Sequence, residues 1–215
     1  MRVLFLVGSL RMGGAERVVS RLSNYWAEKG FDVCVATVRE KESDFYSLHP
    51  NVERLAFSTP PKQSEKYEHY LQQYRAAKSE YKHVVRFEPL LRVGASFRQR
   101  YIRYKKYYNS LRETHRAIQA FEPDVVISFM TGMNFRALAM RPISKAPIII
   151  SERTNPDKQK INRRGNRVRR LTYRYAHKVV FVSEGVADAY PWLPAAKKLV
   201  IYNPAGFLPN PPEHR

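Results

Sequence analysis

The stretch MRVLFLVGSLRMGGAERVVSRLSNYW, residues 1–26, indicates how the rest of the chain folds. Val3 to Val7 form a short unbroken apolar run, which predicts a strand buried on both faces, as in a parallel sheet. A glycine-bearing loop follows. From Ala15 to Trp26 apolar residues then recur at spacings of three and four, which predicts an amphipathic helix that ends before Gly30. Strand, loop and helix in this order predict the first unit of an α/β fold.

Further strands follow at intervals, with helical segments between them. The patterns predict strands at 33–38, 52–57, 124–129, 148–151, 178–183 and 199–202, and short helices at 134–140, 163–176 and 184–190. This alternation predicts an α/β, Rossmann-like, doubly wound and mostly parallel sheet of about seven strands. We expect residues 1–204 to form one domain and the proline-rich residues 205–215 to be a linker or tail.

Residues 62–121 interrupt this pattern and predict a basic helical insertion, with helices at about 64–86 and 96–121. In the second helix, aromatic and aliphatic residues share one face. The opposite face carries Arg98, Arg103, Lys105, Lys106, Arg112 and Arg116. Such a helix can pack on the core with a solvated charged face, or lie on an anionic bilayer. The density of positive charge favours the membrane surface.

The composition restricts the classes of partner. The 215 residues include 38 Lys and Arg against 19 Asp and Glu, a net charge of +19, which favours nucleic acid, an anionic membrane or a phosphorylated substrate. The single cysteine, Cys34, allows no disulfide within the chain and no zinc cluster, and we expect it to be a small buried residue. No apolar run reaches the roughly 18 residues of a membrane span, and no signal peptide is evident, so we expect a cytoplasmic location.

The loop with Gly13 and Gly14 lies where anions bind in folds of this class. The first turn of a helix presents free N–H groups and the positive end of the helix dipole. The spacing matches neither a P-loop, which needs Lys and Ser or Thr after the second glycine, nor a dinucleotide fingerprint, because Leu10 replaces its second glycine. A tight turn without a ligand is the alternative interpretation.

The sequence resembles glycosyltransferase family four. The similarity is carried by GGAER at 13–17, GFDV at 30–33, VVFVSEG at 179–185 and IYNP at 201–204, in the order in which the family has them. The resemblance implies the N-terminal half of a GT-B fold. It also implies a nucleotide-sugar donor such as a UDP-sugar, retention of anomeric configuration, and neither a cofactor nor an obligatory metal.

Two further motifs are similar to those of a bacterial branch of this family. VISF at 126–129, followed by Asn134, and SERTNP at 151–156 resemble enzymes that add hexoses or N-acetylhexosamines to lipid-linked saccharides. The branch implies a role in cell-envelope polysaccharide or lipopolysaccharide synthesis. The expected place is peripheral, on the cytoplasmic face of the cell membrane.

The resemblance assigns expected roles to individual residues. Gly13 and Gly14 are expected near the donor diphosphate. The residues expected to bind the acceptor are Thr131, Asn134, Glu152, Arg153 and Asn155. A local Glu152–Arg153 ion pair that orders the loop is the alternative. From Lys158 to Lys178 the chain is rich in Lys and Arg and has no acid, which predicts a cradle for a pyrophosphate or lipid head groups. Its predicted contacts are Arg163, Arg164, Arg167 and Arg170.

The sequence also departs from the family pattern. Many members carry a histidine just after the fourth strand, but this region reads Ser128-Phe129-Met130-Thr131, so no catalytic residue can be assigned. The C-terminal donor-binding domain is not present in the chain, which is therefore expected to be incomplete as an enzyme. Two alternatives remain: a nucleic-acid-binding module, which is disfavoured because no such motif is found, and a non-catalytic partner subunit that docks a separate donor-binding chain.

Overall fold

The computed structural model describes residues 1–39, 44–57, 111–156 and 163–203, without the side chains of residues 163 and 164. Seven parallel strands form one sheet in the order β3-β2-β1-β4-β5-β6-β7. This confirms the predicted doubly wound α/β fold. The strands are β1 (Arg2–Val7), β2 (Asp32–Thr37), β3 (Val52–Ala56), β4 (Val125–Phe129), β5 (Ile148–Glu152), β6 (Lys178–Phe181) and β7 (Lys198–Val200).

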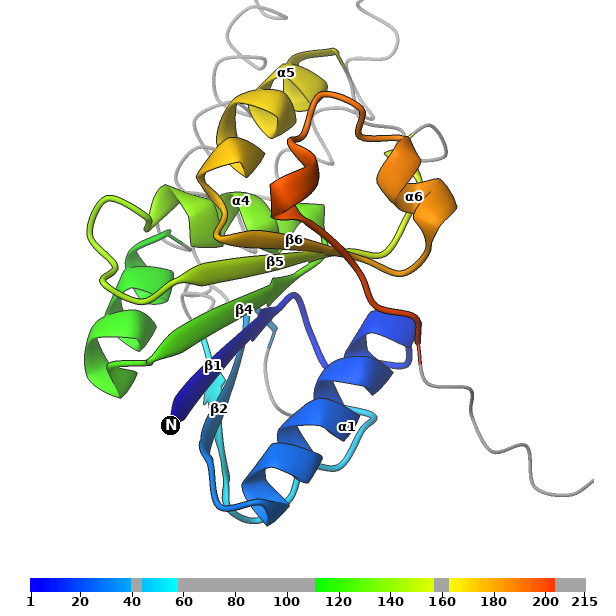
Figure 1. Ribbon diagram of the computed structural model, residues 1–215. Helices are drawn as coiled ribbons and strands as arrows, with labels where there is room; N and C mark the ends of the chain where they lie inside the picture. The colour runs from blue at the N-terminus through cyan, green and yellow to red at the C-terminus, as the bar shows by residue number, and fades with distance from the viewer. Residues whose placement is uncertain (40–43, 58–110, 157–162, 204–215) are drawn as a thin grey trace, which may run out of the picture.

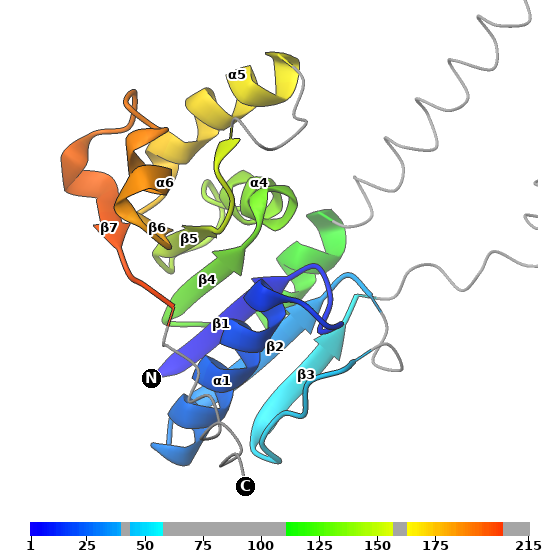
Figure 2. The ribbon, with the colours of Figure 1, turned by 90° about the vertical axis from the view of Figure 1, so that its right-hand side faces the viewer.

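The helices lie on both faces of the sheet. They are α1 (Gly14–Glu28), a helical segment at 111–121, α4 (Thr131–Ala139), α5 (Arg163–Thr172) and α6 (Glu184–Asp188), with short 3-10 turns η4 (Tyr173–Tyr175) and η5 (Ala195–Lys197). Figures 1 and 2 show α1 on one face and α4 on the other. The predicted helix at 134–140 begins earlier, at Thr131, because the chain turns directly from β4 into α4 without a capping side chain that the sequence could reveal.

The alternation of side chains along β1 divides the core into two clusters. Leu4 and Leu6 pack with α4 and the segment 111–121, whereas Val3, Phe5 and Val7 pack under α1. All five are fully buried, as predicted for a central strand of a parallel sheet. Cys34 on β2 is also fully buried, and burial raises the pKa of its thiol to about 12. This confirms its role as a core residue.

The basic insertion is described only at its end. Residues 111–121 are helical, with Ala117, Ile118 and Phe121 buried and Arg112 and Arg116 exposed. The division into an apolar and a basic face is therefore confirmed for this last part. The predicted helix at 64–86 and the rest of the helix at 96–121 lie outside the described residues, and contact with a membrane stays a prediction.

One face of the sheet, over β5, β6 and β7, has no helix on it among the described residues. Alternate side chains of a strand point to opposite faces, and the set that includes Ile150, Val179 and Phe181 is buried in the core. On the other face Ile149 and Val180 are half-buried, Leu199 is 42% exposed, and beyond the end of β7 Ile201 is 56% exposed. Parallel sheets normally have helices on both faces, so this part of the sheet lacks a cover among the described residues.

Gly30 ends α1 in the way that the sequence predicts. Its φ is +80°, and the bonds Phe31 N–H to Trp26 C=O and Gly30 N–H to Ala27 C=O, both 3.0 Å, form a Schellman motif. Gly30→Ala is expected to lower the free energy of unfolding by about 1 kcal/mol, because a Cβ is disfavoured at this φ. Gly132→Ala, on an exposed turn of α4 with open space around it, is the control and should raise it by about 0.5 kcal/mol. Urea unfolding measures both values, and similar effects at the two sites would contradict the account.

Candidate functional site

The strand order locates the candidate site. β1 lies between β2 and β4, and the chain leaves β1 and β4 in opposite directions, towards α1 on one face and α4 on the other. Open α/β sheets bind ligands at such a switch point, beyond the carboxyl ends of the strands. The loop with Gly13 follows β1, and Thr131 follows β4. The fold therefore brings the predicted donor and acceptor residues to one edge of the sheet.

At the glycine loop, Gly13 caps α1 and Gly14 is its first residue. Gly13 has extended backbone, and its carbonyl accepts the Arg17 N–H at 3.0 Å. The Tyr46 hydroxyl accepts the Gly13 N–H at 3.3 Å and donates to the Gly13 carbonyl at 3.0 Å. Tyr46 was not among the predicted site residues, because no local sequence pattern marks a side chain that contacts a residue 33 positions away. That Gly13 and Gly14 lie near a donor diphosphate stays a prediction.

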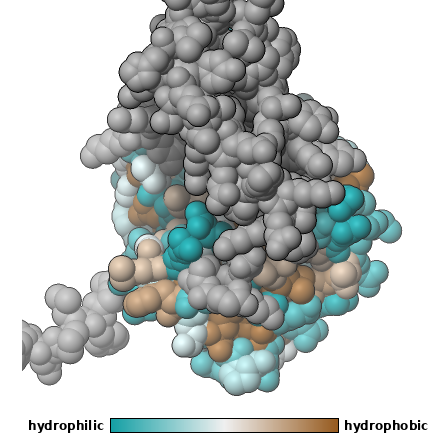
Figure 3. All heavy atoms as spheres, turned by 180° about the vertical axis from the view of Figure 1, so that it is seen from behind, coloured by the Kyte–Doolittle hydropathy of each residue, from teal (hydrophilic) through white to brown (hydrophobic). Residues whose placement is uncertain are grey.

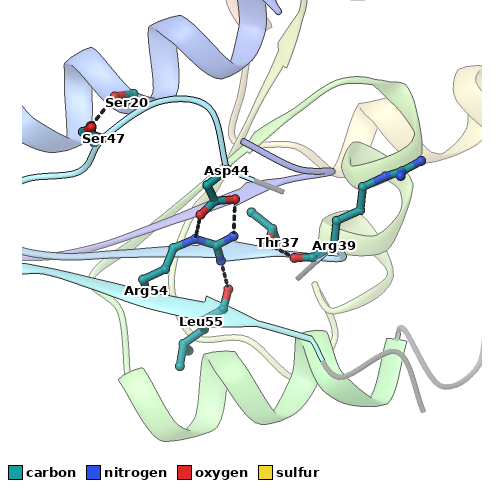
Figure 4. Close-up of polar contacts among 7 residues, drawn as sticks. All are labelled: Ser20, Thr37, Arg39, Asp44, Ser47, Arg54 and Leu55. Atoms are coloured by element: carbon teal, nitrogen blue, oxygen red, sulfur yellow. Dashed lines mark hydrogen bonds and ion pairs between the residues drawn. The ribbon is translucent and has the colours of Figure 1, made fainter. Parts of the chain in front are cut away.

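The segment that carries Tyr46 is held on both sides. Asp44 accepts two hydrogen bonds from Arg54 on β3, at 2.8 and 2.9 Å, and Ser20 on α1 donates to the Ser47 carbonyl at 3.0 Å (Figure 4). Two parallel bonds between a guanidinium and a carboxylate fix orientation as well as distance. Tyr46 is therefore placed on the glycine loop by contacts to both α1 and β3.

The turn from β4 into α4 carries a strained residue. Met130 has φ 72° and ψ 141°, a combination that side chains other than glycine rarely adopt. Its N–H donates to the Ser151 carbonyl at 3.2 Å, and its own carbonyl accepts the Asn134 N–H at 2.9 Å. These bonds hold the corner. The side chain of Met130 is partly exposed at the sheet edge where many family members have a histidine.

Glu152, at the end of β5, is the centre of a buried polar cluster. Its side chain is fully buried. The Thr131 hydroxyl lies 3.1 and 3.2 Å from its two oxygens, the Asn134 amide donates to it at 3.0 Å, and the Tyr173 hydroxyl donates to Oε1. Two of the other predicted acceptor residues, Thr131 and Asn134, thus contact Glu152. Direct contact between Glu152 and a sugar stays a prediction, because in this structure its partners are protein groups.

Opposing influences act on the pKa of Glu152. Burial raises it, and this effect dominates. The hydrogen bond from Tyr173, the charge of Arg169 and the bonds from Asn134 and Thr131 lower it. The pKa of Tyr173 is raised, first by burial and then by the neighbouring Glu152. Glu152 and Tyr173 therefore form a coupled buried pair.

Arg169 on α5 extends the cluster away from the sheet. It is only 2% exposed, its Nη2 lies 3.4 Å from the Thr131 hydroxyl, and its guanidinium lies 5.6 Å from the centre of the Tyr190 ring. This segment was predicted to be a cradle for a pyrophosphate or lipid head groups, and neither Arg169 nor Tyr173 was among its predicted contacts. The available signal was their spacing, because Arg169, Tyr173 and Ala176 share one helical face, and all three are buried.

Arg153 and Asn155 follow β5 and are half-buried. The Arg153 guanidinium lies over the Phe129 ring at 5.1 Å, and its Nη1 donates to the Asn203 side chain. Glu152 and Arg153 therefore have different partners, and the alternative of a local ion pair between them is wrong for this structure. Whether Arg153 or Asn155 binds an acceptor stays a prediction.

The predicted basic contacts are only partly described. Arg167 and Arg170 are exposed on α5, whereas Arg98, Arg103, Lys105 and Lys106 lie outside the described residues, as do the side chains of Arg163 and Arg164. Between the arginines of α5 lie exposed apolar side chains, Val168 and Leu171. Figure 3 likewise shows hydrophobic and hydrophilic residues mixed over the face seen from behind. The surface of the described part is thus not uniformly polar.

The described residues show neither a metal-binding group nor a membrane-spanning helix. No three His, Cys, Asp or Glu side chains in this part of the chain are grouped closely enough to hold a metal ion. None of its helices has the length and apolar content that crossing a bilayer requires.

Comparison with models of known protein families identifies the family of this chain. The sequence model of Glycosyltransferase Family 4 matches residues 12–205, nearly the whole chain. The chain belongs to glycosyltransferase family 4. The match runs from the glycine loop to the end of the seventh strand, so it includes all the candidate site residues above. No curated protein sequence matched the chain.

Solved structures of similar fold support the GT-B assignment. Sucrose-phosphate synthase from Thermosynechococcus elongatus has a TM-score of 0.62 at 11% identity, covering 94% of this family 4 chain and 47% of its own. The lipopolysaccharide outer core galactosyltransferase WaaB, in its apo form, gives 0.57 at 14%, covering 95% and 46%. Anabaena Alr3699/HepE in complex with UDP and glucose gives 0.55 at 14%, covering 94% and 44%. The family 4 chain thus spans about half the length of these proteins.

Proposed function

We propose that this chain is the acceptor-binding half of a retaining glycosyltransferase. The enzyme would transfer a hexose or N-acetylhexosamine from a nucleotide-sugar to a lipid-linked saccharide during bacterial cell-envelope polysaccharide synthesis. The observation that carries the proposal is the convergence of Gly13, Thr131, Asn134, Arg153 and Asn155 at the carboxyl edge of β1, β4 and β5. This edge is where parallel sheets bind their ligands.

The fold alone does not determine which reaction the protein catalyses. UDP-N-acetylglucosamine 2-epimerase from Rickettsia bellii has a similar fold, with a TM-score of 0.54 at 11% identity. Family 4 membership supports the transferase. HepE was solved with UDP and with UDP-glucose, which supports a nucleotide-sugar donor. WaaB acts on lipopolysaccharide by its name, which supports a lipid-linked acceptor.

The chemistry of the site fits binding and orientation of an acceptor. Asn155 and Arg153 are half-buried at the edge and can hydrogen-bond sugar hydroxyls. Beneath them, Glu152 holds Thr131 and Asn134 at the start of α4, so this carboxylate positions the corner at Met130. A rigid corner keeps the acceptor hydroxyl oriented towards the donor, which lowers the entropic cost of the reaction.

Asn155→Ala tests the acceptor role. A short-chain polyprenyl-diphosphate saccharide, titrated calorimetrically into the 215-residue chain, is expected to bind about five- to tenfold more weakly to this variant, because one hydrogen bond is lost. Asn51→Ala, exposed just before β3, is the control and should leave the affinity unchanged. Absence of binding by the unsubstituted chain contradicts the proposed function, whereas equal affinity of both variants contradicts the role of Asn155 alone.

The proposed location is peripheral, on the cytoplasmic face of the membrane, and α5 supports it. Val168, Leu171 and Tyr175 are 43%, 57% and 60% exposed, and their spacing of three and four places them on one stripe of α5 and η4. Arg167 and Arg170 flank this stripe. Exposed apolar residues between arginines are typical of helices that lie in the headgroup region of anionic bilayers.

The double variant Val168→Glu, Leu171→Glu tests this location by vesicle sedimentation. The unsubstituted chain should bind anionic but not neutral vesicles and should release them as salt rises. The variant is expected to bind at least tenfold more weakly, because it removes apolar burial and adds repulsion. Ile143→Glu, 57% exposed elsewhere on the surface, serves as control. An equal loss of vesicle binding in the double variant and in the control would indicate a general effect of the added negative charge. If the unsubstituted chain bound single-stranded nucleic acid and not the vesicles, the nucleic-acid alternative would be favoured.

A further inference from the structure

A small cavity lies beside the buried cluster, between α5 and the loop after α6. Its volume is about 110 Å³, and the residues that line it are Pro156, Asn166, Arg169, Arg170, Ala189, Tyr190 and Trp192. None of them was assigned a sugar contact above, and only Arg170 was predicted to bind an anion. Asn166, Arg169 and Arg170 lie on α5, whereas Ala189, Tyr190 and Trp192 follow α6, and Figure 1 shows α5 and α6 on the same side of the sheet as α4.

The side chains around this cavity are mostly hydrogen-bond donors. Arg169 and Arg170 can only donate, the indole N–H of Trp192 can only donate, and Asn166 and Tyr190 can do so too. No carboxylate is among the described lining residues, and within the described part of the chain Arg170 makes no ion pair. Such a set is chemically suited to an anion with several acceptor oxygens.

The side chains that line the cavity are held in position by contacts with other protein groups. Arg169 is buried between the Thr131 hydroxyl and the Tyr190 ring. Tyr190 stacks on Tyr173 at 6.3 Å with nearly parallel rings, and Trp192 packs against Tyr190 at 5.6 Å. A guanidinium with restricted movement loses little entropy when it binds an oxyanion.

The size of the cavity and the charge of the side chains that line it restrict the class of ligand. A volume of about 110 Å³ corresponds to the space of three or four water molecules at about 30 Å³ each. A phosphate group fits this space. Neighbouring arginines are well suited to phosphate because the planar guanidinium can bind two of its oxygens at once.

We propose that this cavity, lined by Arg169, Arg170, Asn166, Tyr190 and Trp192, is a binding site for a phosphate or diphosphate group. The group can belong to a soluble phosphate compound or to a phosphorylated lipid headgroup, because both present the same oxygens. This inference does not depend on the glycosyl transfer proposed above.

Arg170→Gln and Arg167→Gln form a matched pair for the test. Both arginines are exposed on α5, and only Arg170 lines the cavity. Inorganic phosphate and pyrophosphate are titrated into the 215-residue chain, with ionic strength held constant by chloride. Arg170→Gln is expected to weaken binding by about tenfold, as loss of a charge-assisted hydrogen bond does, and Arg167→Gln to leave it unchanged. Equal effects of the two substitutions, or no binding of either anion, overturn the proposal.

The two tryptophans report where the anion binds. Trp192 lines the cavity, whereas Trp26 lies on α1 and stacks on Phe5. In ¹H–¹⁵N spectra the indole signal of Trp192 should shift on addition of pyrophosphate while that of Trp26 stays. If pyrophosphate binds but both indole signals shift, or neither does, the anion binds elsewhere and the proposed site in the cavity is wrong.

Vesicles distinguish the two sources of the phosphate group. Vesicles with phosphatidic acid present a phosphomonoester, whereas vesicles of equal charge with phosphatidylglycerol present only a diester. Preference for phosphatidic acid, lost in Arg170→Gln, supports a lipid headgroup. Equal binding to both vesicles, combined with pyrophosphate binding that depends on Arg170, supports a soluble ligand. If neither vesicle binding nor pyrophosphate binding depends on Arg170, the proposed site is contradicted.

Discussion

Replacing Glu152 with alanine is expected to lower the free energy of unfolding by about 3–5 kcal/mol. The carboxylate is fully buried and accepts hydrogen bonds from Thr131, Asn134 and Tyr173. Its loss leaves three donors and the nearby positive charge of Arg169 without their common acceptor, in an environment that water does not reach. The three donors come from α4 and η4, so both elements would loosen from β5.

Urea unfolding followed by circular dichroism measures this effect. Glu53→Ala, an exposed glutamate on β3, is the control and should change the free energy of unfolding by less than about 0.5 kcal/mol. Glu152→Gln keeps one acceptor oxygen and should lose less than the alanine variant. If Glu152→Ala were as stable as Glu53→Ala, the buried cluster would not hold the site together.

The pH dependence of the same variants follows from the direction of the shift. Burial raises the pKa of Glu152 above its ordinary value of 4.5, so the native state holds this proton more tightly than the unfolded state. The contribution of the group is therefore fully present below pH 4.5 and decreases as pH rises towards its pKa in the native state. Glu152→Gln lacks a titrating group, so the stability of the unsubstituted chain relative to this variant should fall over that interval. A rise would show that the hydrogen bonds outweigh burial.

Phe5→Ala is expected to cost about as much, about 3–5 kcal/mol, for a different reason. Phe5 lies on the central strand β1 and is fully buried. Its ring stacks on Trp26 at 5.4 Å and packs against Phe129 at 6.2 Å. The substitution removes the Phe5–Trp26 contact between the sheet and α1 and leaves a cavity that a central strand cannot close.

Phe45→Ala provides the matched control for Phe5. Phe45 is 61% exposed and packs only against the edge of Tyr46 among the rings of the described residues. Its replacement should cost less than about 1 kcal/mol. Thermal unfolding compares the two, and a similar loss at both positions would mean that α1 is not anchored through Phe5. Because β1 and α1 flank the glycine loop, the same variant should also weaken any ligand binding there.

The fold could be predicted from local pattern because the strands are short buried runs with helices between them. The apolar run after Arg2 is sufficient for β1, since a strand at the centre of a parallel sheet has no polar face. Gly30 could be assigned to the end of α1 because positive φ strongly selects glycine. The predicted first residues of the helices were less accurate. α4 begins at a strained Met130 that no sequence preference reveals.

The candidate site was predicted only where its residues follow strand ends. Thr131, Asn134 and Glu152 lie on β4–α4 and β5, so topology brought them together. Tyr46 reaches the site across the chain, and Arg169 was concealed in a run of arginines. Neither a long-range contact nor the inward direction of one arginine among many leaves a local pattern. The structure places Glu152 at the centre of a buried cluster, and its direct contact with a sugar stays a prediction.

The face of β5 to β7 that no described element covers should make the colloidal behaviour of this protein depend on salt. Two molecules that met at Leu199 and Ile201 would remove apolar surface from water, but each carries a net charge of +19. In dilute buffer this charge keeps copies apart. The Debye length shortens from about 10 Å at 0.1 M salt to about 3 Å at 1 M, and the repulsion fades while apolar attraction persists. Concentrated salt, which weakens the hold of the arginines on anions, would thus draw copies of the chain together.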